Sequence, residues 1–178
     1  MSRLALLGLL GALFTPACAS KKEPITAAAS PPPPAGDPTA VRVAAIARAT
    51  EANQGGGLAF SPDLLRLCPG VRPPKFGFDS DDLRAAWSDA LDTLATCLKT
   101  GDLKDRSLVL TGHTDPRGEE DYNVALGGRR AEAVKEALSA FGVDGARLTT
   151  TSRGEADAHG TDEATWAQDR RVDLDLRR

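Results

Sequence analysis

Residues 107–130 read SLVLTGHTDPRGEEDYNVALGGRR and contain the passage from strand to helix on which the fold depends. An apolar run at 108–110 predicts a buried strand that ends near Thr114. The composition of 115–118 is typical of a turn. A helical pattern follows over 120–141, and the glycine after it is placed to cap the helix. This stretch therefore predicts a strand, a tight turn and a long helix in succession.

The predicted helix carries two polar side chains on its apolar face. With about 100° of rotation per residue, Arg130 and Asn123 fall within the arc of the apolar residues. That arc holds Leu126, Val134, Ala137, Leu138 and Phe141. Burying an arginine there without acceptors would cost several kcal/mol, so the pattern requires an anion near Arg130.

Asp115 is the nearest candidate for that anion, because it leaves the end of the predicted strand just ahead of the helix. Two interpretations of the spacing stay open. In the first, Asp115 and Arg130 form an internal salt bridge and no ligand is involved. In the second, the two charges are held apart in a cleft and offer an acceptor and a donor to a zwitterion such as an amino acid.

Strand and helix patterns alternate over the rest of the C-terminal region. Residues 75–78 predict a short strand, and 79–101 predict a helix with Trp87 on its apolar, core-facing side. Two further strands are predicted at 147–152 and 171–176. The order is strand, helix, strand, helix, strand, strand. It predicts an α/β (α+β) sandwich with a mixed sheet and helices packed on one face.

The N-terminal part of the chain differs in composition from the rest. Residues 1–18 combine a positive start, an apolar stretch and small residues, as in a bacterial secretory signal, and they end in a segment that resembles a lipobox at Cys18. Residues 19–57 are a tether rich in Pro and Ala, with a short helix offered at 41–51. We therefore expect the folded domain to occupy residues 58–178.

Charge and hydropathy exclude two classes of function. The chain of 178 residues has 22 Lys and Arg against 25 Asp and Glu. That balance lacks the basic surface of a nucleic-acid-binding protein, so no nucleic acid partner is expected. The apolar stretch at residues 4–14 is shorter than the roughly 20 residues of a membrane-spanning helix. The mature protein should therefore not span a membrane.

Three cysteines are present, an odd number for an exported chain. Lipidation of Cys18 leaves Cys68 and Cys97 as a pair, for which a disulfide is the favoured interpretation. Closing the loop between them would stabilise the fold by roughly 3 kcal/mol. The alternative of a metal pair lacks His or Cys neighbours to complete a shell. Removal of Cys18 with the signal is the alternative to its lipidation.

The sequence lacks the signatures of an enzyme. His113 and His159 are its only histidines, and neither has a cysteine or a serine-centred elbow nearby. His113 fits a packed or turn-bonding residue better than a general base. The glycine run at 55–57 is not followed by the Lys-Ser/Thr of a phosphate-binding loop. We expect no catalysis, no cofactor and no metal.

A series of motifs resembles a known family. In chain order it comprises Gly112-His113-Thr114-Asp115, Gly118, Tyr122-Asn123, Leu126, Arg130-Ala131, Gly142-Val143, Arg147-Leu148, Gly154-Glu155 and Asp169-Arg170-Arg171-Val172. From Phe76 to the C-terminus the chain resembles the OmpA-like domain, the peptidoglycan-binding module of outer membrane protein A, peptidoglycan-associated lipoprotein and flagellar motor protein B. Gly127 and Asp169 depart from its pattern, because serine and asparagine are usual there.

The resemblance implies a role in binding the cell wall. In the family, the aspartate of the Gly-His-Thr-Asp motif and the arginine fifteen residues later hold the diaminopimelate of the peptidoglycan stem peptide. Here these residues are Asp115, which would accept from the ammonium, and Arg130, which would pair with the carboxylate. The resemblance also places in the site Thr114, Asn123, Leu126 and Arg170.

The same resemblance implies where the protein works. It describes an outer membrane lipoprotein, anchored through Cys18 and facing the periplasm, that links the membrane to the wall. The alternative function is an envelope scaffold that uses the fold to contact proteins such as those of the Tol system. Loss of wall binding on replacing Asp115 or Arg130 would separate the two.

Overall fold

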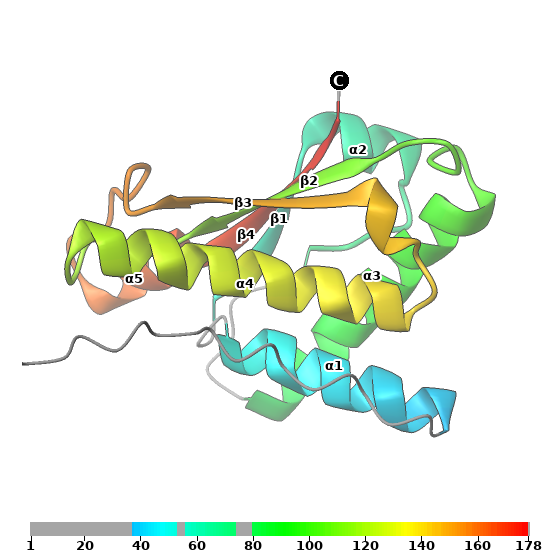
Figure 1. Ribbon diagram of the computed structural model, residues 1–178, viewed down its shortest axis with the longest axis horizontal. Coiled ribbons are helices and arrows are strands. Elements are labelled where there is room, and N and C mark those ends of the chain that lie inside the picture. Colours follow the sequence, from blue (N-terminus) through cyan, green and yellow to red (C-terminus); the bar gives the residue numbers. More distant parts are fainter. Residues whose placement is uncertain (1–36, 53–55, 74–79, 178) are drawn as a thin grey trace, which may run out of the picture. The chain divides into compact units, whose positions relative to one another are not determined.

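A four-stranded mixed sheet carries the fold (Figure 1). The computed structural model describes residues 37–52, 56–73 and 80–177. The predicted signal, the predicted lipidation site Cys18 and most of the predicted tether lie outside the described residues, and so does the strand predicted at 75–78. All described residues belong to one unit, which spans 33–178.

The strands of the sheet are β1 (Gly57–Phe60), β2 (Leu108–His113), β3 (Leu148–Gly154) and β4 (Arg171–Leu176). Their order across the sheet is β1-β4-β2-β3. Strand β4 runs parallel to β1 and antiparallel to β2, whereas β2 runs parallel to β3. The sheet is therefore mixed, as the sequence predicts.

One face of the sheet is buried. Leu108 and Leu110 of β2 are buried, and so are Val172 and Leu174 of β4, whereas the residue between each pair is only partly buried. Successive side chains of a strand point to opposite faces, so these apolar residues share one face. Helix α4 (Glu120–Ala140) packs against β2 and β3 and covers that face, which confirms the predicted one-sided arrangement (Figure 1).

The other helices are α1 (Pro38–Ala52), α2 (Pro62–Leu67), α3 (Ser80–Thr100) and α5 (Glu163–Asp169), with a 3-10 turn η1 at Gly145–Arg147. The ends of α3 and α4 agree with the prediction to within one residue. Trp87 of α3 is fully buried, as expected. Within the described ranges, no helix is both long and apolar enough to cross a membrane.

Helix α1 is part of the packed unit. The sequence instead predicts that the folded domain begins at residue 58, which would leave this helix in the tether. It packs against α4 and α3 (Figure 1). Its residues Ala45, Ile46 and Ala49 are buried in the hydrophobic core. Two of these three are alanines, so the apolar stripe is weak in the sequence although the helix is buried against its neighbours.

Two short elements lie where the sequence predicts neither a strand nor a helix. Strand β1 begins at Gly57, the last residue of the glycine run, and is held in the sheet by pairing with β4. Helix α5 begins after Asp162, whose carboxylate accepts from the Thr165 N–H in a capping box. Elements of this length depend on tertiary pairing or on one cap, and they show little periodicity.

Cys68 and Cys97 form the predicted disulfide. Cys68 follows α2, and Cys97 lies in the last turn of α3, at a sequence separation of 29. Cys68 is fully buried and Cys97 packs against the core. The bond therefore joins the segment after β1 to the helix that precedes β2.

Candidate functional site

The site begins where helix α4 makes its closest approach to strand β2. A Cβ atom on Gly112 would collide with the Gly127 carbonyl oxygen, and one on Gly127 would lie 2.7 Å from the Gly112 oxygen. It would also collide with the Ser152 side chain on β3. Only glycine fits both positions, which accounts for Gly127 in mid-helix despite the cost of glycine there. This contact brings the first half of α4 to the end of β2.

Asp115 lies just beyond the end of β2 and accepts hydrogen bonds from two arginines. Arg117 donates from Nε to Oδ1 at 3.0 Å and from Nη2 to Oδ2 at 2.9 Å, and its backbone N–H also reaches Oδ1 at 3.2 Å. Arg170 donates from Nη1 to Oδ2 at 3.2 Å. These bonds, those of Arg117 above all, lower the pKa of Asp115 to about 2. The carboxylate is therefore ionised at neutral pH.

Arg130 is buried with only 1% of its surface exposed, as its place on the apolar arc predicts. Its Nη1 donates to the carbonyl oxygen of His113 at 2.8 Å. Burial, followed by the charge of Arg170, lowers the pKa of Arg130 to about 10, while the charge of Asp115 opposes this shift. The side chain remains a cation at neutral pH. The ion pairs of Asp115 are made with Arg117 and Arg170.

A small pocket of about 190 Å³ brings most of the predicted site residues together. It is lined by Thr114, Asp115, Arg117, Tyr122, Asn123, Leu126 and Arg130. Five of the six side chains that the family resemblance placed in the site are among these seven. The sixth, Arg170, lies behind the pocket against Asp115. The pocket thus has a carboxylate and two guanidinium groups in its wall, beside an apolar leucine.

Two further groups shape the pocket. Asn123 is buried, and its Nδ2 donates to the Arg117 carbonyl at 3.1 Å and to the Glu155 carboxylate, which holds the turn after β2 against α4. Thr114 is also buried, and its backbone N–H donates to the Gly154 carbonyl at 2.8 Å. Among the described residues the Thr114 hydroxyl has no hydrogen-bond partner. A buried hydroxyl in this state is available to a ligand.

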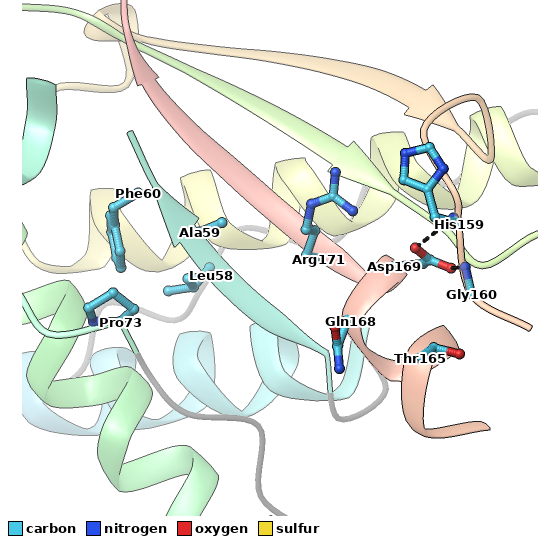
Figure 2. A pocket seen from close by; sticks show the side chains of 10 residues that line it. All are labelled: Leu58, Ala59, Phe60, Pro73, His159, Gly160, Thr165, Gln168, Asp169 and Arg171. Carbon is cyan, nitrogen blue, oxygen red and sulfur yellow. Dashed lines mark hydrogen bonds between the residues drawn. The ribbon is translucent and has the colours of Figure 1, made fainter. Parts of the chain in front are cut away.

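The C-terminal pair Asp169 and Arg170 supports the site from outside the pocket. Arg170 joins Asp115 to Glu163, to which its Nη2 donates at 2.9 Å. Asp169 accepts from the backbone N–H groups of His159 at 3.1 Å and Gly160 at 2.8 Å, as the dashed lines in Figure 2 show. Position 169 thus holds an aspartate where asparagine is usual in the family. Two backbone N–H groups of the neighbouring loop stabilise the charge of this aspartate.

The sequence did not single out three residues at this site. Arg117 was part of a predicted turn, yet it is the main partner of Asp115. Trp166 lies in α5 with its ring 4.2 Å from the Arg117 guanidinium, and Glu163 is 3.3 Å from the same group. Residues 117 and 166 are far apart in sequence, so only the fold of α5 shows that they meet.

A larger hollow of about 950 Å³ lies beside β1 (Figure 2). Its two charged groups are already paired, since Arg171 donates to Asp173 at 2.9 Å and Asp169 accepts from two backbone N–H groups. It contains none of the predicted binding residues. The smaller pocket, where opposite charges converge, is therefore the better candidate for recognition.

The geometry does not suggest catalysis. His113 is buried, its Nε2 lies 3.1 Å from Asp173 Oδ2, and its carbonyl oxygen accepts from Arg130. These contacts agree with a packed residue rather than a general base. In the part of the chain that the structure describes, no three His, Cys, Asp or Glu side chains are placed to hold a metal ion.

The C-terminal part of the chain is similar to known proteins of the bacterial envelope. The sequence profile of the OmpA family matches residues 75–172. A peptidoglycan-associated lipoprotein of Pseudomonas putida is 46% identical over 101 residues, which cover 56% of this chain and 59% of the relative. Outer membrane protein A of Serratia marcescens is 35% identical over 115 residues, or 57% of this chain and 32% of the relative.

Among solved structures, the peptidoglycan-associated lipoprotein of Burkholderia pseudomallei matches with a TM-score of 0.46 and 44% identity, covering 49% of this chain and 75% of that one. The chain spans about three fifths of the length of the Pseudomonas relatives, at 59% and 58%. The relatives are named for peptidoglycan or the outer membrane, not for a reaction, which agrees with the prediction that the domain is not an enzyme.

Proposed function

This chain belongs to the OmpA family, and from that premise we propose that its C-terminal domain binds peptidoglycan non-covalently through the diaminopimelate of the stem peptide. One observation carries the proposal: Asp115 and Arg130, chosen from the sequence, line one pocket with Thr114, Asn123 and Leu126. A carboxylate and a guanidinium in the wall of one small pocket suit a ligand that carries an ammonium and a carboxylate on one carbon.

Each lining group has a role in this proposal. Asp115, ionised at neutral pH, accepts from the ammonium of diaminopimelate. Arg130, buried and held by the His113 carbonyl, donates to the carboxylate. The Thr114 hydroxyl supplies a further hydrogen bond, and Leu126 contacts the methylene chain. Because most of these groups are buried and fixed before the ligand arrives, little side-chain entropy is lost on binding.

Arg170 has a supporting role rather than the ligand contact that the resemblance implies. Its Nη1 is bonded to Asp115 and its Nη2 to Glu163, and it does not line the pocket. It therefore fixes the orientation of the Asp115 carboxylate and ties α5 to the end of β2.

The rest of the chain places this domain in the envelope. We propose that residues 1–18 are a signal, that Cys18 carries lipid in the outer membrane, and that residues after it form a tether in the periplasm. The relatives named as lipoproteins support this arrangement. A single stem-peptide residue offers little contact area, but many anchored copies facing one polymer gain strength by avidity. The protein then links the outer membrane to the wall.

Co-sedimentation with purified diaminopimelate-type sacculi tests the proposal. The protein used spans residues 33–178, the unit that includes α1. Asp115→Asn and Arg130→Met should each abolish sedimentation while the variants stay folded. Asp63→Asn and Arg66→Met provide matched controls, because that pair of the same residue types is exposed, with a 3.2 Å ion pair away from the pocket.

The outcomes separate wall binding from a scaffold function. Loss of sedimentation in the two pocket variants and not in the two controls supports the proposal. Undiminished sedimentation of the pocket variants, or none by the unchanged protein, contradicts it. The latter result would favour protein partners in the envelope, such as those of the Tol system.

A further inference from the structure

The acceptor that the ligand ammonium needs is already occupied in the structure. Arg117 covers both oxygens of Asp115, with donor distances of 3.0 and 2.9 Å. Arg170 reaches Oδ2 as well, at 3.2 Å. A carboxylate that holds two guanidinium groups has little capacity left for a third cation. An ammonium can therefore pair fully with Asp115 only if one arginine first breaks its hydrogen bonds to this carboxylate.

Arg117 is the arginine able to move. Its side chain is 52% exposed, whereas that of Arg170 is 10% exposed and fixed at its other end by Glu163. The backbone of Arg117 is held in place, since its carbonyl accepts from Asn123. Exposed long side chains change rotamer rapidly and at low cost. Movement would therefore be confined to the Arg117 side chain.

A released Arg117 would remain beside the pocket. Its guanidinium lies 4.2 Å from the Trp166 ring centroid, a cation–π distance. Its Nη1 is 3.3 Å from Glu163 Oε2. Both partners come from α5, and neither is part of the pocket wall. They keep the cation within reach of a ligand after it leaves Asp115.

Charge balance shows which ligand favours the exchange. The pocket wall carries the cations Arg117 and Arg130 and the anion Asp115. An ammonium alone would add a third cation and leave Arg117 without the partner it gave up. A ligand with ammonium and carboxylate on one carbon adds no net charge, and its carboxylate replaces Asp115 as the partner of Arg117.

We propose that Arg117 is an exchangeable occupant of the Asp115 subsite, which makes the pocket select ligands that carry an ammonium and a carboxylate on one carbon over ligands with an ammonium alone. This inference rests on the proposed function, because it assigns a specificity-determining residue to the same pocket. Arg117 gives up Asp115 to the ammonium and takes the carboxylate together with Arg130.

Two tripeptides that differ only in the terminal group of one side chain test the exchange. The first is L-Ala-γ-D-Glu-meso-diaminopimelate, and in the second L-lysine replaces diaminopimelate, so that the distal ammonium lacks its carboxylate. Calorimetry with the 33–178 protein compares the unchanged chain with Arg117→Gln. Arg66→Gln is the control, because Arg66 is also an exposed arginine paired with an aspartate. Thermal unfolding checks that each variant is folded.

The inference predicts a change in selectivity. The unchanged protein and Arg66→Gln should prefer the diaminopimelate peptide by about tenfold or more, as expected for one charge-assisted pair. In Arg117→Gln that ratio should fall several-fold, because the lysine peptide gains affinity once it no longer competes with Arg117. The Nε–Hε NMR signal of Arg117 should also shift when the unchanged protein binds the diaminopimelate peptide.

Other results overturn the inference. An equal loss of affinity for both peptides in Arg117→Gln would make Arg117 a general contact, and an unchanged ratio would make it a bystander. An Arg117 signal that stays in place on binding would exclude the exchange. These three outcomes leave the proposed function standing. Failure of the unchanged protein to bind either peptide would overturn both.

Discussion

The two halves of helix α4 use the same face for opposite purposes. In the first half, Asn123, Gly127 and Arg130 are buried between the helix and the sheet. In the second half, the buried residues are apolar and include Val134 and Leu138. Helix α4 as a whole packs on β2 and β3, so both sets of buried residues belong to one packed helix.

The difference shows that one helix can contain a half that stabilises the fold and a half that forms part of the binding pocket. Burial of Arg130 lowers its pKa to about 10, which means that the folded protein disfavours the charge that the site needs. Burial of an apolar side chain such as Leu138 contributes about 1.5–3 kcal/mol. The second half therefore stabilises the fold, while the first half lowers stability in order to hold polar groups at the pocket.

The largest effect is expected where the first half touches the sheet. Gly112→Ala should lower the unfolding free energy by about 3 kcal/mol or more and abolish binding to sacculi, because its Cβ displaces α4 at Gly127. Gly128→Ala is the control, since its Cβ would meet only Ser152 at 4.0 Å. That variant should gain up to about 1 kcal/mol from helix propensity. Denaturant unfolding measures both, and similar behaviour of the two variants would refute this packing account.

The second half should affect stability alone. Leu138 is fully buried. Leu138→Ala is expected to cost about 2–5 kcal/mol of unfolding free energy, from lost burial and a residual cavity. The folded fraction should bind sacculi as the unchanged protein does. A selective loss of binding at equal folded fraction would show that the two halves are not separable.

Arg130→Met should show the reverse pattern. Replacing a buried charge by an apolar side chain of similar length is often neutral or stabilising. We expect an unfolding free energy within about 1 kcal/mol of the unchanged protein, or above it, together with at least a tenfold loss of affinity for the diaminopimelate tripeptide. Strong destabilisation would mean that Arg130 mainly holds the fold together.

Asp115 should contribute to stability in a pH-dependent way. Its pKa falls from 3.8 to about 2 on folding, so its carboxylate stabilises the fold above pH 4, and this contribution is lost as the pH falls toward 2. The difference in unfolding free energy between the unchanged protein and Asp115→Asn should reach at most about 2 kcal/mol at pH 6. It should shrink between pH 4 and pH 2. A difference that is constant over this range would contradict the ion pairs with Arg117 and Arg170.

The smallest effect is expected at Asp169, which stands where asparagine is usual in the family. Asp169→Asn removes one of two acceptors for the backbone of His159 and Gly160. The unfolding free energy should fall by about 1 kcal/mol. Peptide affinity should change less than twofold, because Asp169 does not line the pocket. Calorimetry that shows a large gain in affinity would instead mean that the Asp169 charge weakens Arg170.

Much of this division is visible in the sequence. The periodicity of α4 predicts that Arg130 and Asn123 are buried, and both are 1% exposed. The strand and turn before the helix place Asp115 beside them, and the structure puts all three in one pocket. Periodicity succeeds here because the elements are long and joined by a tight turn.

Other parts depend on contacts that no local pattern encodes. The close approach of Gly112 and Gly127 appears in the sequence only as an unfavourable glycine in a helix. The position of Arg117 on Asp115 depends on α5, which brings Trp166 and Glu163 from 46 or more residues away. Side chains that meet across the fold in this way are set by topology rather than by spacing.

Mapping the binding site by NMR tests the central claim most directly. The 33–178 protein, labelled with ¹⁵N, is titrated with the diaminopimelate tripeptide, and changes in amide chemical shift are followed. The account predicts shifts at Thr114–Gly118 and in the first half of α4, up to Arg130, with little change from Val134 to Ala140. Shifts centred on the hollow beside β1, or spread evenly along α4, would contradict it.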